Sequence, residues 1–173
     1  MRTTRLYPTS MNKLLKYSLA CLFFALACPT IQAQTDWKSY PYPAVNCSIN
    51  FPAPPTTAQE GDVWTAQAKH EDVIYQIVVY INKQYAKTNV EAVLAESMNG
   101  FINPATDQIE KTESLIINGL PAKQVYVRSQ DGSYLVFQTL ASNTKLYQLA
   151  IAGTNPAQTA AKAKKFLDSF KIE

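Results

Sequence analysis

The stretch between residues 109 and 152 constrains the fold more than any other part of the sequence. Four segments rich in β-branched and aromatic residues follow one another there, and turn residues separate them. The segments are 109–117, 122–128, 134–140 and 145–152, and the turns contain Asn118-Gly119, Asp131-Gly132 and Ser142-Asn143. Asn-Gly and Asp-Gly supply the positive φ angles that tight hairpins require. The pattern therefore predicts a four-stranded antiparallel meander.

The rest of the chain adds three strands and two helices to this meander. Strands are expected near 45–51, 63–69 and 73–82, the last of them dense in apolar residues on both faces. One helix is expected from Thr88, where Thr88-Asn89-Val90-Glu91 fits a capping box, and another from Asn155-Pro156 to about residue 170. We expect one α+β domain over 44–173, an antiparallel sheet with two main helices packed on it.

The N-terminal segment has the features of a secretory signal peptide over residues 1–33. Lys13 and Lys16 precede an apolar run from 17 to 28, which Pro29 follows. The run has 12 residues, whereas a membrane-spanning helix needs about 20. We therefore expect an exported protein, periplasmic or extracellular, without a transmembrane anchor.

Two features of the signal leave alternatives open. Cleavage after Ala33 is favoured because the peptidase requires a small residue before the cut, while lipid attachment at Cys28 is the less favoured alternative. Translation begins at Met1 or at Met11; a signal peptide is predicted from either start.

Removal of residues 1–33 changes what charge and cysteine content imply. These residues hold four basic and no acidic groups, so the remainder has 12 Lys and Arg against 13 Asp and Glu, a net charge of −1. Nucleic-acid binding loses its support, because it depends on a clustered basic surface. Cys47 is the one thiol left; it alternates with Val45 and Ile49, which predicts a buried, inert position in a strand.

Two segments are candidate interaction surfaces. Residues 34–43 form an extended Pro and aromatic arm that carries Trp37, Tyr40 and Tyr42, which either pack on the domain or bind a partner. Lys162, Lys164 and Lys165 form a short basic face on the last helix, which is either solvated or meets an anionic partner.

Five sequence features together resemble the PsbP-like superfamily. They are a first strand ending in Phe51-Pro52, a mid-chain helix, the hairpin INGLPAKQVYV at 117–127, the strand KLYQLAIAG at 145–153 and the helix end FLDSFKI at 166–172. The chain looks most like the short exported bacterial members of unknown role. The resemblance implies an α/β/α sandwich with an antiparallel sheet and a non-enzymatic accessory role, and it transfers no catalytic residue.

The residues themselves offer little chemistry. His70 is the only histidine and lies in an expected turn, no nucleophile motif accompanies it, and no glycine-rich nucleotide motif is present. We therefore predict no catalytic residue, metal or cofactor. The leading hypothesis is an extracytoplasmic binding module that holds a protein partner on a sheet face or in a sheet–helix cleft; the alternatives are a small secreted hydrolase and a self-associating envelope protein.

Overall fold

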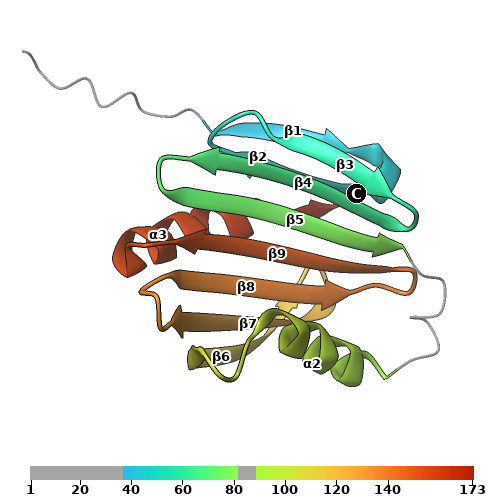
Figure 1. The fold of residues 1–173 in the computed structure, drawn as a ribbon. Helices are drawn as coiled ribbons and strands as arrows, with labels where there is room; N and C mark the ends of the chain where they lie inside the picture. The colour runs from blue at the N-terminus through green and yellow to red at the C-terminus, as the bar shows by residue number, and fades with distance from the viewer. Residues whose placement is uncertain (1–36, 82–88) are drawn as a thin grey trace, which may run out of the picture. The chain divides into compact units, whose positions relative to one another are not determined.

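The computed structural model describes residues 37–81 and 89–173, and its strands form two antiparallel sheets (Figure 1). The larger sheet has seven strands in the order β3-β4-β5-β9-β8-β7-β6, and the smaller has three in the order β1-β2-β10. The strands are β1 Lys38–Tyr42, β2 Cys47–Phe51, β3 Thr56–Glu60, β4 Val63–His70, β5 Val73–Ile81, β6 Asp107–Ile117, β7 Leu120–Ser129, β8 Tyr134–Ala141, β9 Lys145–Gly153 and β10 Lys171–Ile172. The helices are α2 Val90–Phe101, α3 Pro156–Leu167 and a 3-10 turn, η2, Pro43–Val45.

The predicted meander is present as β6-β7-β8-β9, and the α+β class is confirmed. Consecutive strands pair antiparallel throughout. Asn118 and Gly119 have φ angles of 51° and 78°, and Gly132 has 85°. The turn residues therefore adopt the left-handed conformations that their sequence predicted.

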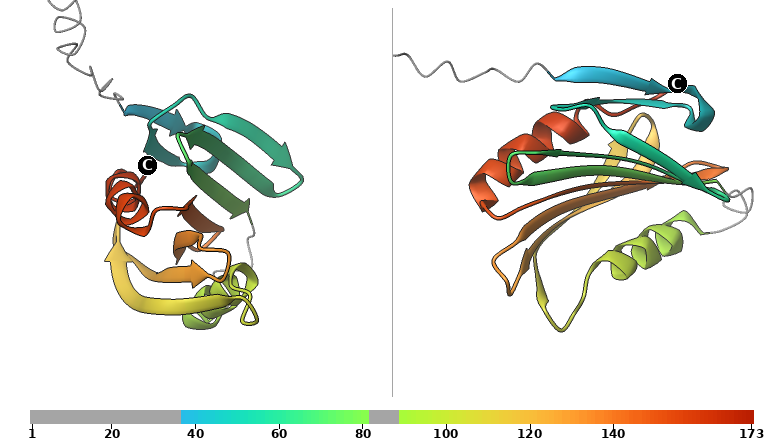
Figure 2. Two further views of the ribbon diagram at one scale, coloured as in Figure 1. Left: turned by 60° about the vertical axis from the view of Figure 1, so that its left-hand side comes forward. Right: turned by 45° about the horizontal axis from the view of Figure 1, so that its top comes forward.

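The main core lies between the seven-stranded sheet and a second layer made of α3 and the three-stranded sheet (Figure 2). Phe166 of α3 is fully buried at the centre. Its ring meets Phe51 of β2 at 5.2 Å and Tyr75 of β5 at 5.5 Å, both edge-on. One aromatic side chain thus joins all three elements of the core.

Helix α2 packs on the opposite face of the large sheet, against β8 and β7. Leu94 and Met98 are buried there, and the ring of Phe101 stacks on Phe137 at 4.2 Å. Because α2 covers β7, β8 and the part of β9 from Leu146 to Ala150, the side of this face formed by β3, β4 and most of β5 receives no helix from the described chain.

The structure differs from the sequence prediction in three strands and in the second sheet. The segment expected as an extended arm contains β1, which pairs with β2 along its whole length. The segment 56–60, left unassigned, is β3, and the chain end, predicted as helix to about 170, turns after Leu167 into β10. Each of these strands is short and lacks a strong alternating pattern, because each borders solvent on one face or one edge.

Both helices begin at an asparagine N-cap, whereas for α2 the sequence predicted Thr88 in this role. Asn155 caps α3 as predicted, since its side chain accepts a hydrogen bond from the Gln158 N–H at 3.1 Å. Asn89 caps α2 through the Glu91 N–H at 3.0 Å. Thr88 and the predicted signal segment, with Cys28 and Ala33, lie outside the described residues. Neither described helix has the length and hydropathy that a bilayer-spanning segment needs.

Candidate interaction surfaces

The open half of the α2-side sheet face is a surface that no helix of the described chain covers. Side chains alternate along a strand, so Ile74, Gln76 and Val78 of β5 point to this face while their neighbours enter the core. Register places Thr65, Gln67 and Lys69 on β4 and Ala152 on β9 beside them, whereas Gln148 and Ala150 on the same side of β9 are buried against α2. We call Thr65, Gln67, Lys69, Ile74, Gln76, Val78 and Ala152 the open face.

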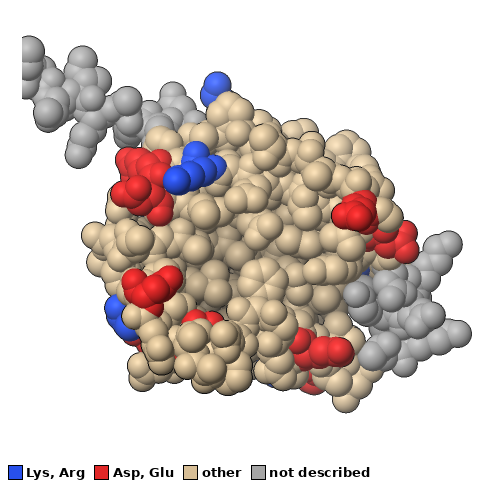
Figure 3. Space-filling model, viewed as in Figure 1, with Lys and Arg blue, Asp and Glu red and all other residues tan. Residues whose placement is uncertain are grey.

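The open face is nearly free of charge. Lys69 alone among its members is ionised; it lies at one end of the face, beside its cross-strand neighbour Ile74, which keeps 39% of its surface exposed. Figure 3 shows the same property, with acidic and basic side chains gathered toward the rim. Where Val63 and Thr65 of β4 meet Ala58 and Glu60 of β3, the face is hollowed by a shallow pocket of about 260 Å³. Depletion of charge at the centre of a patch with a polar rim is typical of protein interfaces.

A buried polar row borders the open face where α2 begins to cover the sheet. Ser97 of α2 lies 3.0 Å from the Thr139 hydroxyl and accepts a hydrogen bond from the Gln148 side-chain amide at 2.7 Å. Gln148 is 6% exposed, and its Oε1 atom has no hydrogen-bond partner within the described chain. The row fixes α2 on the sheet through side chains and leaves one acceptor at the boundary of the face.

The aromatic side chains of the predicted arm turn inward. Trp37, Tyr40 and Tyr42 are half-buried and pack against the main core. Tyr42 meets the Trp64 ring at 4.5 Å, and Trp37 lies edge-on to Tyr75 at 5.4 Å. Burial raises the pKa of Tyr42 to about 12. All three side chains thus make packing contacts within the domain.

The three lysines of the predicted basic face are each engaged within the chain. Lys162 donates to the Glu71 carboxylate, and Lys164 pairs with Asp168 at 2.6 Å. The Lys165 ammonium lies 5.0 Å from the centre of the Trp37 ring. The lysines therefore do not present an unpaired basic surface, although Lys164 remains largely exposed.

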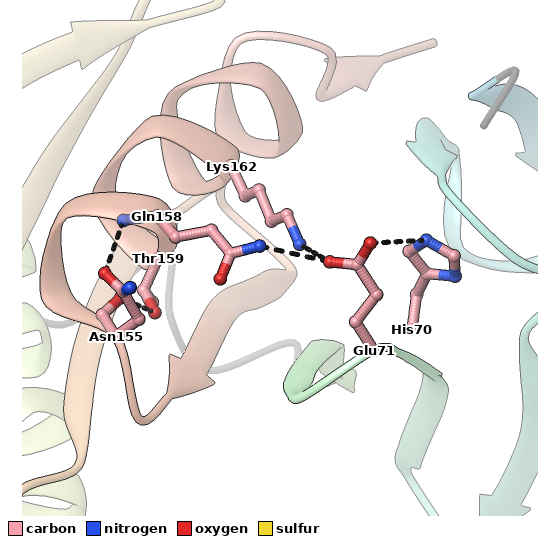
Figure 4. A network of polar contacts seen from close by, with 6 residues as sticks. All are labelled: His70, Glu71, Asn155, Gln158, Thr159 and Lys162. Atoms are coloured by element: carbon pink, nitrogen blue, oxygen red, sulfur yellow. Dashed lines mark hydrogen bonds and ion pairs between the residues drawn. The ribbon is translucent and has the colours of Figure 1, made fainter. Parts of the chain in front are cut away.

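His70 lies beside the β4–β5 turn, within a polar network that joins this turn to α3 (Figure 4). Glu71 accepts hydrogen bonds from Lys162 and, at 3.1 Å, from the Gln158 amide, while its other oxygen lies 3.8 Å from His70 Nε2. The hydrogen bond from Lys162 lowers the pKa of Glu71. The network fastens a turn to a helix, and it contains no nucleophile that His70 could activate.

Other titratable groups give no catalytic arrangement either. Within residues 37–81 and 89–173 no cluster of three His, Cys, Asp or Glu side chains could hold a metal ion. Cys47 is a buried free thiol whose pKa burial raises to about 12. A thiol in this state is a poor nucleophile, and its burial agrees with the prediction.

Sequence reasoning missed the open face. The β5 segment VIYQIVVYI indicated a strand buried on both sides, because eight of its nine residues are apolar or aromatic. Gln76, at its middle, was the one signal that half of this strand meets water. Which half stays open depends on where α2 docks, which local pattern does not specify.

The fold thus defines a class, an α+β sandwich with one partly open sheet face. No family model matches the sequence, and no curated protein matches it. Among solved structures, cyanobacterial PsbP (CyanoP) from Synechocystis sp. PCC 6803 superposes with a TM-score of 0.57 at 10% identity, over 85% of this chain and 98% of that one. The chain therefore has a PsbP-like fold.

Two further structures resemble it less. A protein of unknown function from Pseudomonas aeruginosa, PA94, described as a putative regulator, gives a TM-score of 0.45 at 12% identity over 73% of this chain and 88% of its own. A protein from Bacteroides thetaiotaomicron gives 0.40 at 14% identity over 79% of this chain and 48% of its own. Neither adds to the argument at this similarity.

Proposed function

We propose that the protein is an exported, non-enzymatic accessory module that binds a protein partner on the open face. The observation that carries the proposal is this half-exposed surface around Ile74 and Gln76, with Lys69 as its one charged member, which the described chain leaves without a helix. Export rests on the signal segment of residues 1–33. The PsbP-like fold and the lack of a catalytic arrangement in the described chain support a binding role.

The composition of the face indicates the kind of partner. Ile74 and Ala152 can bury apolar area, and the glutamine and threonine side chains beside them can exchange hydrogen bonds with a polar rim. A strongly charged ligand would find one basic side chain, Lys69, and no opposing array. A folded protein with a mixed apolar and amide surface fits this pattern.

The test is photo-crosslinking in the cell envelope, with the photoreactive group placed at Gln76 in the open face. The control carries the same group at Gln108, an exposed position on strand β6. We expect Gln76 to capture a discrete partner that Gln108 does not capture. Ile74→Arg should reduce this capture at least tenfold, since it replaces the most exposed apolar side chain of the face by a second charge beside Lys69. Ile116→Arg is its control, because Ile116 is 73% exposed on β6, at the opposite edge of the sheet.

Two outcomes contradict the proposal. Equal capture from Gln76 and Gln108 would show that the contact is not specific to the face. Unchanged capture in Ile74→Arg, with the variant folded by circular dichroism, would show that the partner binds elsewhere.

A further inference from the structure

The two described sheets have four edges, and three of them carry features that oppose pairing with another strand. β10 has two residues, β1 contains Pro41, and β6 has a register shift between Ile109 and Lys111 together with charged residues. Short strands, prolines, bulges and charges are the usual protections of a sheet edge. The fourth edge, β3, has none of these within its length except Glu60 at its end.

The backbone of β3 is available for a further strand. All five of its residues are exposed, and their sequence is Thr-Thr-Ala-Gln-Glu. The Ala58 carbonyl accepts a hydrogen bond from the Thr65 hydroxyl at 3.4 Å, so the Ala58 backbone faces β4. Because backbone groups alternate in an antiparallel pair, the N–H and C=O groups of Thr57 and Gln59 point to the free edge.

We propose that β3 pairs antiparallel with β3 of a second copy, about a two-fold axis at Ala58. In this register Thr57 of each copy lies opposite Gln59 of the other copy. The four free N–H and C=O groups of each strand therefore find hydrogen-bond partners. Glu60 then lies opposite Thr56, so no like charges oppose each other. With a net charge of −1 over residues 34–173, little long-range repulsion opposes the approach of two copies.

This arrangement has a consequence for the open face. A two-fold axis relating antiparallel strands stands perpendicular to their sheet, so the two open faces lie on the same side and become continuous. If the proposed function holds, a partner meets two adjacent sites, which raises its avidity. Five residues pair over much less area than the roughly 1,200 Å² of a stable interface, so the dimer is weak and is populated only at high protein concentration.

The test is sedimentation of the processed protein, purified after export through its own leader, from 10 µM to about 1 mM. We expect the mean mass to rise toward that of a dimer. The Gln59 N–H points to the free edge and makes no hydrogen bond to β4. Gln59→Pro removes this N–H and should abolish the rise in mean mass, whereas Gln59→Thr keeps it and should preserve the rise. A mean mass that stays monomeric in the wild type, or a Gln59→Pro variant that is folded and still dimerises, overturns the proposal.

Substitution of Ala58 tests the symmetry axis independently. Ala58→Lys and Ala58→Asp each set like charges opposite one another, so each should be monomeric alone and the two should dimerise when mixed. Failure of the mixture to dimerise, when the wild type does so, would place the contact elsewhere. Because these measurements need no partner, their failure would reject the dimer and leave the crosslinking result at Gln76 untouched.

Discussion

Gly153, at the end of β9, offers a sharp test of how α3 packs on the large sheet. A Cβ atom at this position would lie 2.6 Å from Thr159 Oγ1 and 3.1 Å from Val73 Cγ2. Thr159 is fully buried, and its hydroxyl donates to the Asn155 carbonyl at 2.7 Å, so it has little freedom to withdraw. Gly153→Ala must therefore displace α3 or break this hydrogen bond.

The expected cost follows from two opposing effects. Overpacking of this kind costs about 1–3 kcal/mol. Replacing glycine by alanine recovers about 0.4–1 kcal/mol by restricting the unfolded chain. We expect Gly153→Ala to lower the free energy of unfolding by about 1–2 kcal/mol, with the residual cost set by the steric overlap at Thr159.

The assay is denaturant unfolding, followed by the fluorescence of Trp37 and Trp64, with an unchanged slope m. In a Thr159→Ala background the clashing oxygen is gone, so the cost of Gly153→Ala should fall by about 1 kcal/mol. Gly100→Ala is the matched control: its Cβ would meet no atom within 4 Å on α2, and it should stabilise by about 0.5–1 kcal/mol. An equal cost of Gly153→Ala in both backgrounds would refute the packing argument.

Three further predictions test the core and its titration. Phe166→Ala, which empties the junction of α3, β2 and β5, should cost about 3–5 kcal/mol in the same assay, and Phe166→Leu clearly less; equal losses would contradict the aromatic contacts. Cys47 should resist a thiol reagent at pH 8 until the protein unfolds. Burial raises the pKa of Cys47 from 9.0 to about 12. Its contribution to the free energy of unfolding is therefore complete below pH 9 and falls as the pH rises toward 12. Denaturation from pH 8 to 12 should show a shallower decline in Cys47→Ala than in the wild type. The hydrogen bond from Lys162 lowers the pKa of Glu71 from 4.5, so the contribution of Glu71 to the free energy of unfolding is present above that pH and is lost below it. Glu71→Gln should therefore make stability fall less steeply as the pH is lowered. An unchanged fall would show that the pair with Lys162 is not maintained in solution.

The candidate surfaces show where sequence reasoning reached its limit. Lysines at 162, 164 and 165 do lie on one helix, and Lys164 pairs with Asp168 at the end of that helix, but the partners of Lys162 and Lys165, Glu71 and Trp37, are far away in the sequence. For the aromatic residues near 37–42 the sequence favours packing on the domain and leaves a partner-binding arm as the alternative. Local pattern indicates that a side chain must find a partner, and it does not indicate which distant segment provides one.

The sequence by itself determined the elements whose cause is local. Asn118-Gly119 and Asp131-Gly132 produce the meander, Asn155 caps α3 as its position predicts, and the alternation around Cys47 predicts its burial, because turn chemistry, capping and period-two burial act over a few residues. Tertiary structure alone decided that β10, at the C-terminal end, pairs with β2 near residue 47. It also decided that Phe166 contacts both β2 and β5, and that α2 covers β7 and β8. These features depend on contacts between segments far apart in the chain, and they decide which sheet face and which edge stay free for another molecule.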